Sequence, residues 1–169
     1  MAEDITKLTN KTIDEGGVLA LLYFDIHGNS KEAVQEVGTA FIQQILEREG
    51  VVYALGEIEE PVESIEKENK DGKYSTHIEV KILTKNFYYL TVICAINSPF
   101  NIEILRPDRI SMDIAQAHEL LATVSTTTAE YKSHIIRKLS TPEDADRYTE
   151  YMKKRAEMGR AILEKKDGV

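Results

Sequence analysis

Two segments of the chain carry side chains that suit acid–base or metal chemistry. Asp25 and His27 close the apolar run VLALLYFDI, and His77 and Glu79 alternate with apolar residues further on. Imidazole and carboxylate groups bind Zn²⁺ or Fe²⁺ and also form general acid–base pairs. If the two segments are neighbouring strands, these groups converge on one surface. The candidate ligand-binding residues, called the sheet-face cluster below, are Tyr23, Asp25, His27, His77 and Glu79.

A simpler explanation of the same residues is cross-strand pairing of polar side chains on a half-exposed sheet. Metal sites normally have a more specific ligand set than two histidines and two carboxylates. The sequence therefore favours neither a bound metal nor a cofactor, although a metal-dependent or acid–base enzyme stays open as an alternative.

A second candidate is the turn Gly28-Asn29-Ser30-Lys31, which opens a predicted helix. Free N–H groups at a helix start and a lysine could hold a phosphate or carboxylate. A simple capped turn is the preferred reading, because Ser30 can itself accept from the first-turn N–H groups. The glycine pattern of a Walker or dinucleotide-binding loop is absent.

The elements around these residues are clear from their periodicity. A helix is predicted over 31–49, with one apolar stripe, Ser30 as N-cap and Gly50 as the residue after its end. Gly38 lies inside that stripe, which indicates close approach to a sheet. The strand at 18–26 is apolar on both faces, so we expect a central strand covered on both sides, by the helix and by the C-terminal helices or a second subunit.

Further strands are predicted at 51–58, 74–83 and 100–104. Pro61 indicates that the strand at 51–58 is an edge strand. Residues 59–73 are highly charged and end in Asp71-Gly72, which favours a solvated hairpin tip. Residues 86–97 fit a buried helix, with a strand as the competing interpretation. The order β-α-β-β-α-β predicts an α+β fold with a ferredoxin-like sheet.

The remaining sequence is helical. Residues 1–17 form an N-terminal helical segment, 18–110 the ferredoxin-like domain, and 111–169 helices that pack on this domain or on a partner subunit. Ser111 is the expected cap of a helix over 113–139, interrupted near 125–128 by poor helix formers. Thr141-Pro142 starts the last helix.

Residues 74–131 resemble a known family. The stretch HIEVKILTKNFYYLTVICAINSPFNIEILRPDRI, followed by a helix, is similar to the ferredoxin-like C-terminal extension of WYL-type transcription regulators. Residues 102–107 match its last strand. The chain has no Trp and shows no upstream helix-turn-helix. The resemblance implies ligand sensing or assembly, and it carries no functional residue over.

Composition narrows the function mainly by exclusion. The net charge of −8 and the scattered basic residues argue against nucleic-acid binding. The longest apolar run is too short to span a membrane, and the first residues lack the features of a secretory signal. A single cysteine fits a reducing cytoplasm. We therefore expect a cytoplasmic protein that binds neither nucleic acid nor membrane.

The leading functional hypothesis is a non-enzymatic ligand-binding or regulatory module that works as a homo-oligomer, with a dimer favoured. A small-molecule ligand is expected between the sheet-face cluster and the helix at 113–139. The alternatives are the small enzyme named above and an adaptor that binds a protein partner through residues 141–166.

Overall fold

The computed structural model describes residues 2–63, 73–139 and 141–166. It divides into two compact units, Met1–Ala122 and Thr123–Val169. The helices are α1 (Ala2–Asp14), α2 (Lys31–Leu46), α3 (Phe87–Asn97), α4 (Ile114–Leu139) and α5 (Pro142–Lys166). The strands are β1 (Val18–Gly28), β2 (Val51–Ile58), β3 (Val62–Glu63), β4 (Tyr74–Thr84) and β5 (Asn101–Arg106).

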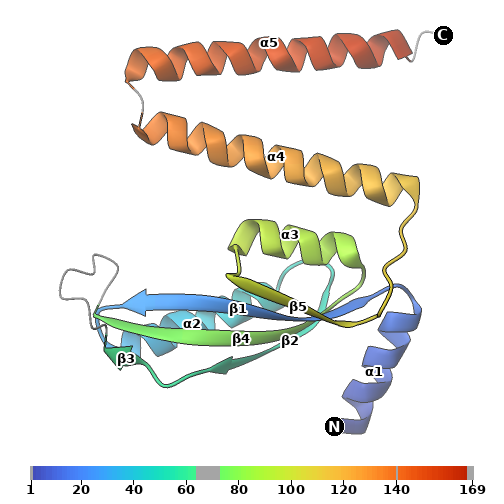
Figure 1. Ribbon diagram of the computed structural model, residues 1–169, viewed down its shortest axis with the longest axis vertical. Coiled ribbons are helices and arrows are strands. Elements are labelled where there is room, and N and C mark those ends of the chain that lie inside the picture. Colours follow the sequence, from blue (N-terminus) through green and yellow to red (C-terminus); the bar gives the residue numbers. More distant parts are fainter. Residues whose placement is uncertain (1, 64–72, 140, 167–169) are drawn as a thin grey trace. The chain divides into compact units, whose positions relative to one another are not determined.

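One antiparallel sheet organises the first unit (Figure 1). The strands lie in the order β2-β4-β1-β5, and the short β3 pairs with the start of β4. This confirms an α+β protein with β1 in a central position and β2 at an edge, as Pro61 indicates. The predicted hairpin tip at 59–73 falls largely on 64–72, which lie outside the described residues.

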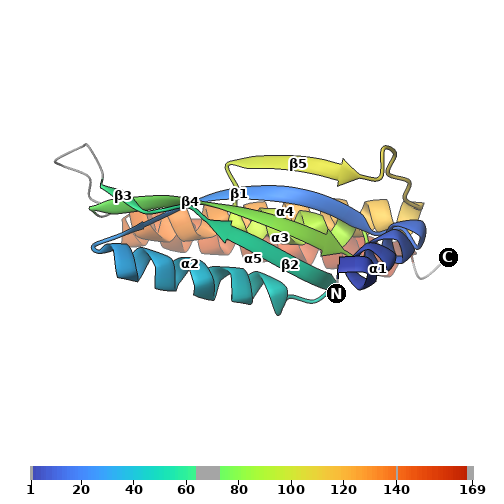
Figure 2. The same ribbon diagram turned by 90° about the horizontal axis from the view of Figure 1, so that it is seen from below.

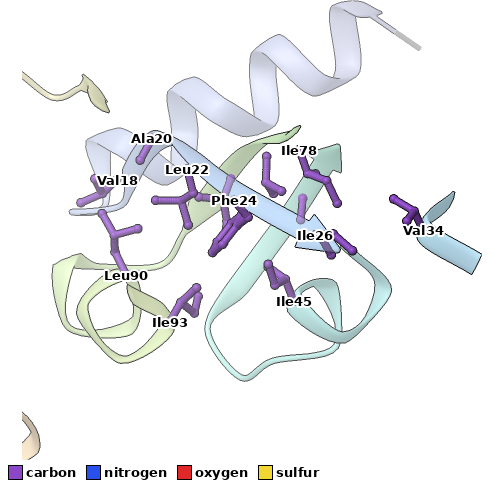
Figure 3. Close-up of a cluster of buried hydrophobic side chains, with 13 residues drawn as sticks. Val18, Ala20, Leu22, Phe24, Ile26, Val34, Ile45, Ile78, Leu90 and Ile93 are labelled. Carbon is purple, nitrogen blue, oxygen red and sulfur yellow. The ribbon is translucent and has the colours of Figure 1, made fainter. Parts of the chain in front are cut away.

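The core lies on one face of the sheet and is shown in Figure 3. Alternate residues of β1 point into it, and α2 and α3 close it from the other side. Its members are Val18, Ala20, Leu22, Phe24, Ile26, Val34, Ile45, Ala54, Ile78, Val80, Ile82, Leu90 and Ile93. Because every second β1 residue is apolar and buried, the register of this strand is strongly specified.

Segment 86–97, which the sequence left between helix and strand, is the helix α3. Asn86 caps it, because its Oδ1 accepts a hydrogen bond from the Tyr89 N–H at 3.1 Å. Leu90 and Ile93 are buried, while Phe87 and Cys94 pack at the margin of the core. The helix presents one apolar side to the sheet, as the helical interpretation required.

Helix α2 begins as predicted, with the Ala33 N–H donating to Ser30 Oγ at 3.1 Å. It ends at Leu46 with Glu47 as C-cap, so the predicted end near residue 49 was too late. Gly50 has φ +78° in the loop beyond the helix. A Cβ on Gly38 would lie 3.0 Å from Ile78 Cδ1, which confirms the close approach of α2 to the sheet.

The opposite face of the sheet is covered at one end by α1 (Figure 2). Thr9 Oγ1 lies 3.0 Å from Tyr53 Oη, and Arg106 Nη1 donates to Asn10 Oδ1 at 2.7 Å. Leu19 and Leu83, which share this face, are buried. Part of the second cover expected for β1 therefore comes from the N-terminal helix, to which the sequence analysis gave no such role.

Two local predictions for α4 were wrong. Asp113, rather than Ser111, caps the helix: the Gln116 N–H donates to Asp113 Oδ1 at 2.8 Å, and the Asp113 N–H donates to Gln116 Oε1. The helix also runs unbroken through 125–128. There, the Thr128 hydroxyl donates to the Val124 carbonyl and stays within the helical ladder.

Helix α5 starts where the sequence placed it. The Asp144 N–H donates to Thr141 Oγ1 at 3.3 Å, and the same hydroxyl donates to Asp144 Oδ2 at 2.7 Å. Pro142 occupies the first helical position, where its missing N–H costs no hydrogen bond.

Candidate functional site

The register of β1 and β4 brings most of the sheet-face cluster together. Tyr23 pairs with Glu79, Asp25 with His77, and His27 with Ser75. All of these residues project from the face opposite the core, because the alternate positions of both strands are buried in it. Four of the five predicted side chains therefore form two neighbouring cross-strand pairs, Tyr23 with Glu79 and Asp25 with His77.

The closest contact in the cluster joins Asp25 and His77. His77 Nδ1 lies 2.5 Å from Asp25 Oδ1, and the side chains of His77 and Asp25 are 62% and 44% exposed. The His77 ring also meets the Phe100 ring edge-on, with centroids 5.9 Å apart. The Asp25 carboxylate contacts Nδ1, so a further group would have to approach the imidazole at Nε2.

Tyr23 links the cluster to the edge strand β5. Its hydroxyl donates to Glu103 Oε1 at 3.3 Å. Partial desolvation raises the pKa of Tyr23, and the negative charges of Glu103 and Glu79 raise it further. The phenol is therefore held protonated as a hydrogen-bond donor.

Sequence reasoning missed Glu103 and Phe100 as members of this surface. The Phe100 N–H donates to the Tyr23 carbonyl at 2.9 Å, which places Phe100 beside the cluster. Glu103 pairs with Leu21 across β1 and β5. The alternation of residues 100–104 predicted the strand itself. It did not show that this strand pairs with the strand at 18–26, and this pairing brings Glu103 to Tyr23.

His27 lies one row beyond the contacts just described, at the end of β1 next to Ser75. Among the residues that the structure describes, no group of three or more His, Cys, Asp or Glu side chains is arranged to hold a metal ion. The geometry of the cluster is thus that of paired polar side chains around one imidazole.

The turn at 28–31 is occupied by its own contacts. Ser30 caps α2, and Lys31 Nζ lies 3.7 Å from Glu60 Oε1. A Cβ on Gly28 would lie 2.9 Å from Val34 Cγ2, so this glycine allows the chain to pass close to α2. These contacts are those of the capped turn that the sequence analysis preferred to an anion site.

A cavity of about 320 Å³ lies within the first unit, away from the sheet-face cluster. The end of α1, the start of β1, the start of α3 and the segment that leads into α4 form its walls. The apolar residues of its lining include Ile13, Val18, Phe87, Pro107, Met112 and Leu120. Its volume falls within the range of small-molecule sites, which is roughly 300–1,000 Å³. We call it the Lys85–Arg109 cavity.

Four charged residues line the Lys85–Arg109 cavity: the two cations that name it, and Asp14 and Glu15. Glu15 Oε1 is 3.9 Å from Lys11 Nζ. Neither Lys85 nor Arg109 forms an ion pair with any residue in the described ranges. The backbone at Lys85 is fixed, since its N–H donates to the Gly50 carbonyl at 2.8 Å. The cavity thus offers two cations, beside two carboxylates, to a ligand that carries an anionic group.

Fold and surface together define an α+β protein with one antiparallel sheet and C-terminal helices. A family model described as the MJ0538 family matches residues 19–154, and the chain belongs to this family. No curated protein and no solved structure matches the chain. In the described part of the chain, no helix has both the length and the apolar character needed to cross a membrane.

Proposed function

We propose that the protein is a non-enzymatic ligand-binding or regulatory module that works as a homo-oligomer in the cytoplasm. The observation that carries the proposal is the Lys85–Arg109 cavity, an open concave site that combines apolar and polar lining residues with two cations without ion pairs among the described residues. Ligand sites in proteins typically have this combination of a concave apolar surface and a few convergent polar groups.

We propose further that the sheet is ferredoxin-like. Support comes from the strand order β2-β4-β1-β5, from antiparallel pairing throughout, and from the helical crossovers α2 and α3 on one face. This fold serves many functions, so it carries no function by itself. The resemblance of residues 74–131 to the WYL-type extension stays a prediction, and its implied role in ligand sensing or assembly agrees with the proposal.

The ligand that fits the cavity best is a small organic anion with an apolar body. A carboxylate or phosphate group would meet Lys85 and Arg109, and hydrogen bonds to charged groups contribute about 1.5–3 kcal/mol each. An aromatic or branched apolar part would contact Phe87 and Met112. Asp14 would take part only if the ligand also carries a cation.

Titration with benzoate, followed by amide NMR spectra, tests this assignment. We expect shifts concentrated at residues 85–88 and 107–112, and dissociation constants raised about tenfold or more by Lys85→Ala and by Arg109→Ala. The same titration with free phenylalanine, which carries both a carboxylate and an ammonium group, tests the role of Asp14. If Asp14 contacts the ammonium group, Asp14→Asn weakens the binding of phenylalanine.

Lys81→Ala is the matched control, because Lys81 is an exposed lysine of β4 that does not line the cavity. It should leave benzoate binding unchanged. Shifts spread evenly over the surface, or equal weakening by Lys81→Ala and Arg109→Ala, would contradict a site in the cavity.

A second candidate function is acid–base catalysis at the sheet-face cluster, and the observation that favours it is the contact of Asp25 with His77. An imidazole oriented by a carboxylate can accept a proton at its other nitrogen. Hydrolysis of 4-nitrophenyl acetate tests this reactivity. The candidate requires rates at least about tenfold lower in both His77→Ala and Asp25→Asn, with His134→Ala as control; equal rates in all four proteins would exclude it.

A further inference from the structure

Strand β1 has an open edge along its second half. β4 pairs with it over its full length, from Val18 to Gly28, whereas β5 pairs only with residues 19–23. In the described part of the chain, residues 24–28 therefore have a neighbouring strand on one side alone. An open strand edge is a template for pairing with another extended chain.

The direction of the backbone groups along β1 follows from its contact with Phe100. The Phe100 N–H donates to the Tyr23 carbonyl at 2.9 Å, so the backbone groups of Tyr23 point to the β5 side. Backbone groups alternate in direction along a strand. The N–H and C=O groups of Asp25 and His27 therefore point to the same side, where β5 no longer accompanies β1.

The pairing of β4 leads to the same direction. The His77 carbonyl accepts a hydrogen bond from the Glu59 N–H at 3.1 Å, so the backbone groups of His77 point away from β1. His77 and its partner Asp25 are thus a pair that is not hydrogen-bonded, and the backbone groups of Asp25 also point away from β4. The open edge offers two N–H donors and two carbonyl acceptors in the spacing of a strand.

A cavity of about 220 Å³ lies directly beside this edge. Its apolar lining comes from Phe24, Ile26, Phe41 and Phe100. Phe24 and Ile26 belong to the core, so the cavity lies on the core side of the edge (Figure 3). Its volume is below the roughly 300–1,000 Å³ of small-molecule sites. It suits one apolar side chain of a segment that pairs along the edge.

The other face of the sheet is acidic beside the same edge. Asp25 projects from it with 44% of its side chain exposed. Glu79 pairs with Tyr23 there, and Glu103 accepts a hydrogen bond from the Tyr23 hydroxyl. A residue opposite Asp25 on an added strand would project from this same face. A lysine or arginine there would meet carboxylates, and the next residue would point to the cavity.

We propose that residues 24–28 of β1 bind an extended peptide segment of another protein, in which basic and apolar residues alternate, as an additional strand. Asp25 and His27 supply the backbone hydrogen bonds, and the cavity takes an apolar side chain. In this mode of binding, main-chain hydrogen bonds give affinity and side-chain pockets give specificity. The site shares no lining residue with the Lys85–Arg109 cavity, so the proposal goes beyond the small-anion binding of the proposed function.

Titration of the full-length protein with acetyl-KVKVKV-amide, followed by amide NMR spectra and hydrogen exchange, tests the proposal. We expect shifts at residues 23–28, 41 and 97–100, and exchange of the Asp25 and His27 amides slowed about tenfold or more in the bound state. The charge-reversed peptide acetyl-EVEVEV-amide should bind about tenfold or more weakly. No binding at about 1 mM peptide, equal affinity for the two peptides, or shifts confined to other strands would each overturn the proposal.

His27→Pro and His27→Ala form a matched pair of variants. Proline removes the N–H that points to the open edge and spares the pairing with β4, whereas alanine removes only the imidazole. We expect His27→Pro to raise the dissociation constant about tenfold or more and His27→Ala to change it less than about twofold, and circular dichroism verifies that both variants fold. Equal weakening by the two variants would overturn pairing along this edge. Slow exchange of the Asp25 and His27 amides without peptide, increasing with protein concentration, would show instead that a second copy covers the edge.

Discussion

His77 on β4 and Asp25 on β1 face each other across the central strand pair, with Nδ1 and Oδ1 2.5 Å apart. Both side chains are substantially exposed, and exposed ion pairs contribute only about 0–1 kcal/mol to stability. The consequence of the contact is therefore orientation: it turns the imidazole against Phe100 and beside Glu79.

Replacement of Asp25 should separate orientation from stability. We expect Asp25→Asn to lower the free energy of unfolding by less than about 1 kcal/mol, while the NMR cross-peaks between the His77 and Phe100 rings weaken. Glu57→Gln, on the same sheet face, serves as control and should leave those cross-peaks intact. A loss above about 2 kcal/mol in urea unfolding would mean that the pair has a structural role greater than an exposed pair allows.

Gly50 should tolerate no side chain. Its φ of +78° is strained for any L-residue, and a Cβ there would overlap the Tyr89 ring. Gly16 has φ +97° with open space around it, so Gly16→Ala measures the backbone strain alone.

We expect Gly16→Ala to cost about 1–2 kcal/mol and Gly50→Ala to cost clearly more, because the Tyr89 ring must also move. Thermal unfolding of both variants checks the difference. Equal losses would show that the Tyr89 ring does not lie against Gly50.

Two leucines of the sheet, one buried and one half-exposed, should contribute very different amounts to the free energy of unfolding. Leu22 is completely buried in the core, whereas Leu55 on β2 is 50% exposed. We expect Leu22→Ala to lower the free energy of unfolding by about 2–5 kcal/mol and Leu55→Ala by about 0.5 kcal/mol. Similar losses at the two sites in urea unfolding would place the core on the wrong face of the sheet.

Cys94 gives a prediction about pH. Burial raises the pKa of its thiol from an ordinary value of 9.0 to about 11. Because the folded state holds this proton more tightly, its contribution to stability is complete below pH 9 and is lost as the pH rises through about 11.

The thiolate is the reactive form, so labelling of Cys94 by a thiol reagent should be slow in the folded protein at pH 8 and fast in denaturant. Cys94 is the single cysteine of the chain, which makes the signal unambiguous. Equal rates in the folded and unfolded protein would show that the thiol is not shielded.

Local signals in the sequence predicted the elements that position the site. Ser30 and Thr141 mark helix starts because each hydroxyl meets an otherwise free N–H nearby in the chain. The alternation of residues 74–83 placed His77 and Glu79 on the exposed face for a similarly local reason. Residues 86–97 form a helix in which Asn86 caps the first turn and Leu90 and Ile93 are buried against the sheet. The burial of these two side chains depends on the rest of the fold, so the local sequence left helix and strand open.

Relationships between distant segments could not be predicted in the same way. Glu103 reaches Tyr23 only through the pairing of β5 with β1, and Thr9 reaches Tyr53 only because α1 folds across the sheet. The Lys85–Arg109 cavity likewise depends on four segments that are far apart in the chain. The helix break expected at 125–128 failed because the Thr128 hydroxyl finds a partner inside the helix.

Native mass spectrometry of the protein as purified tests the central claim, a homo-oligomeric ligand-binding module, most directly. We expect a species of twice the 19.1 kDa chain mass that gains the mass of benzoate when this anion is added, and that loses this gain with Arg109→Ala. A species at the mass of one chain that never retains benzoate would contradict the account.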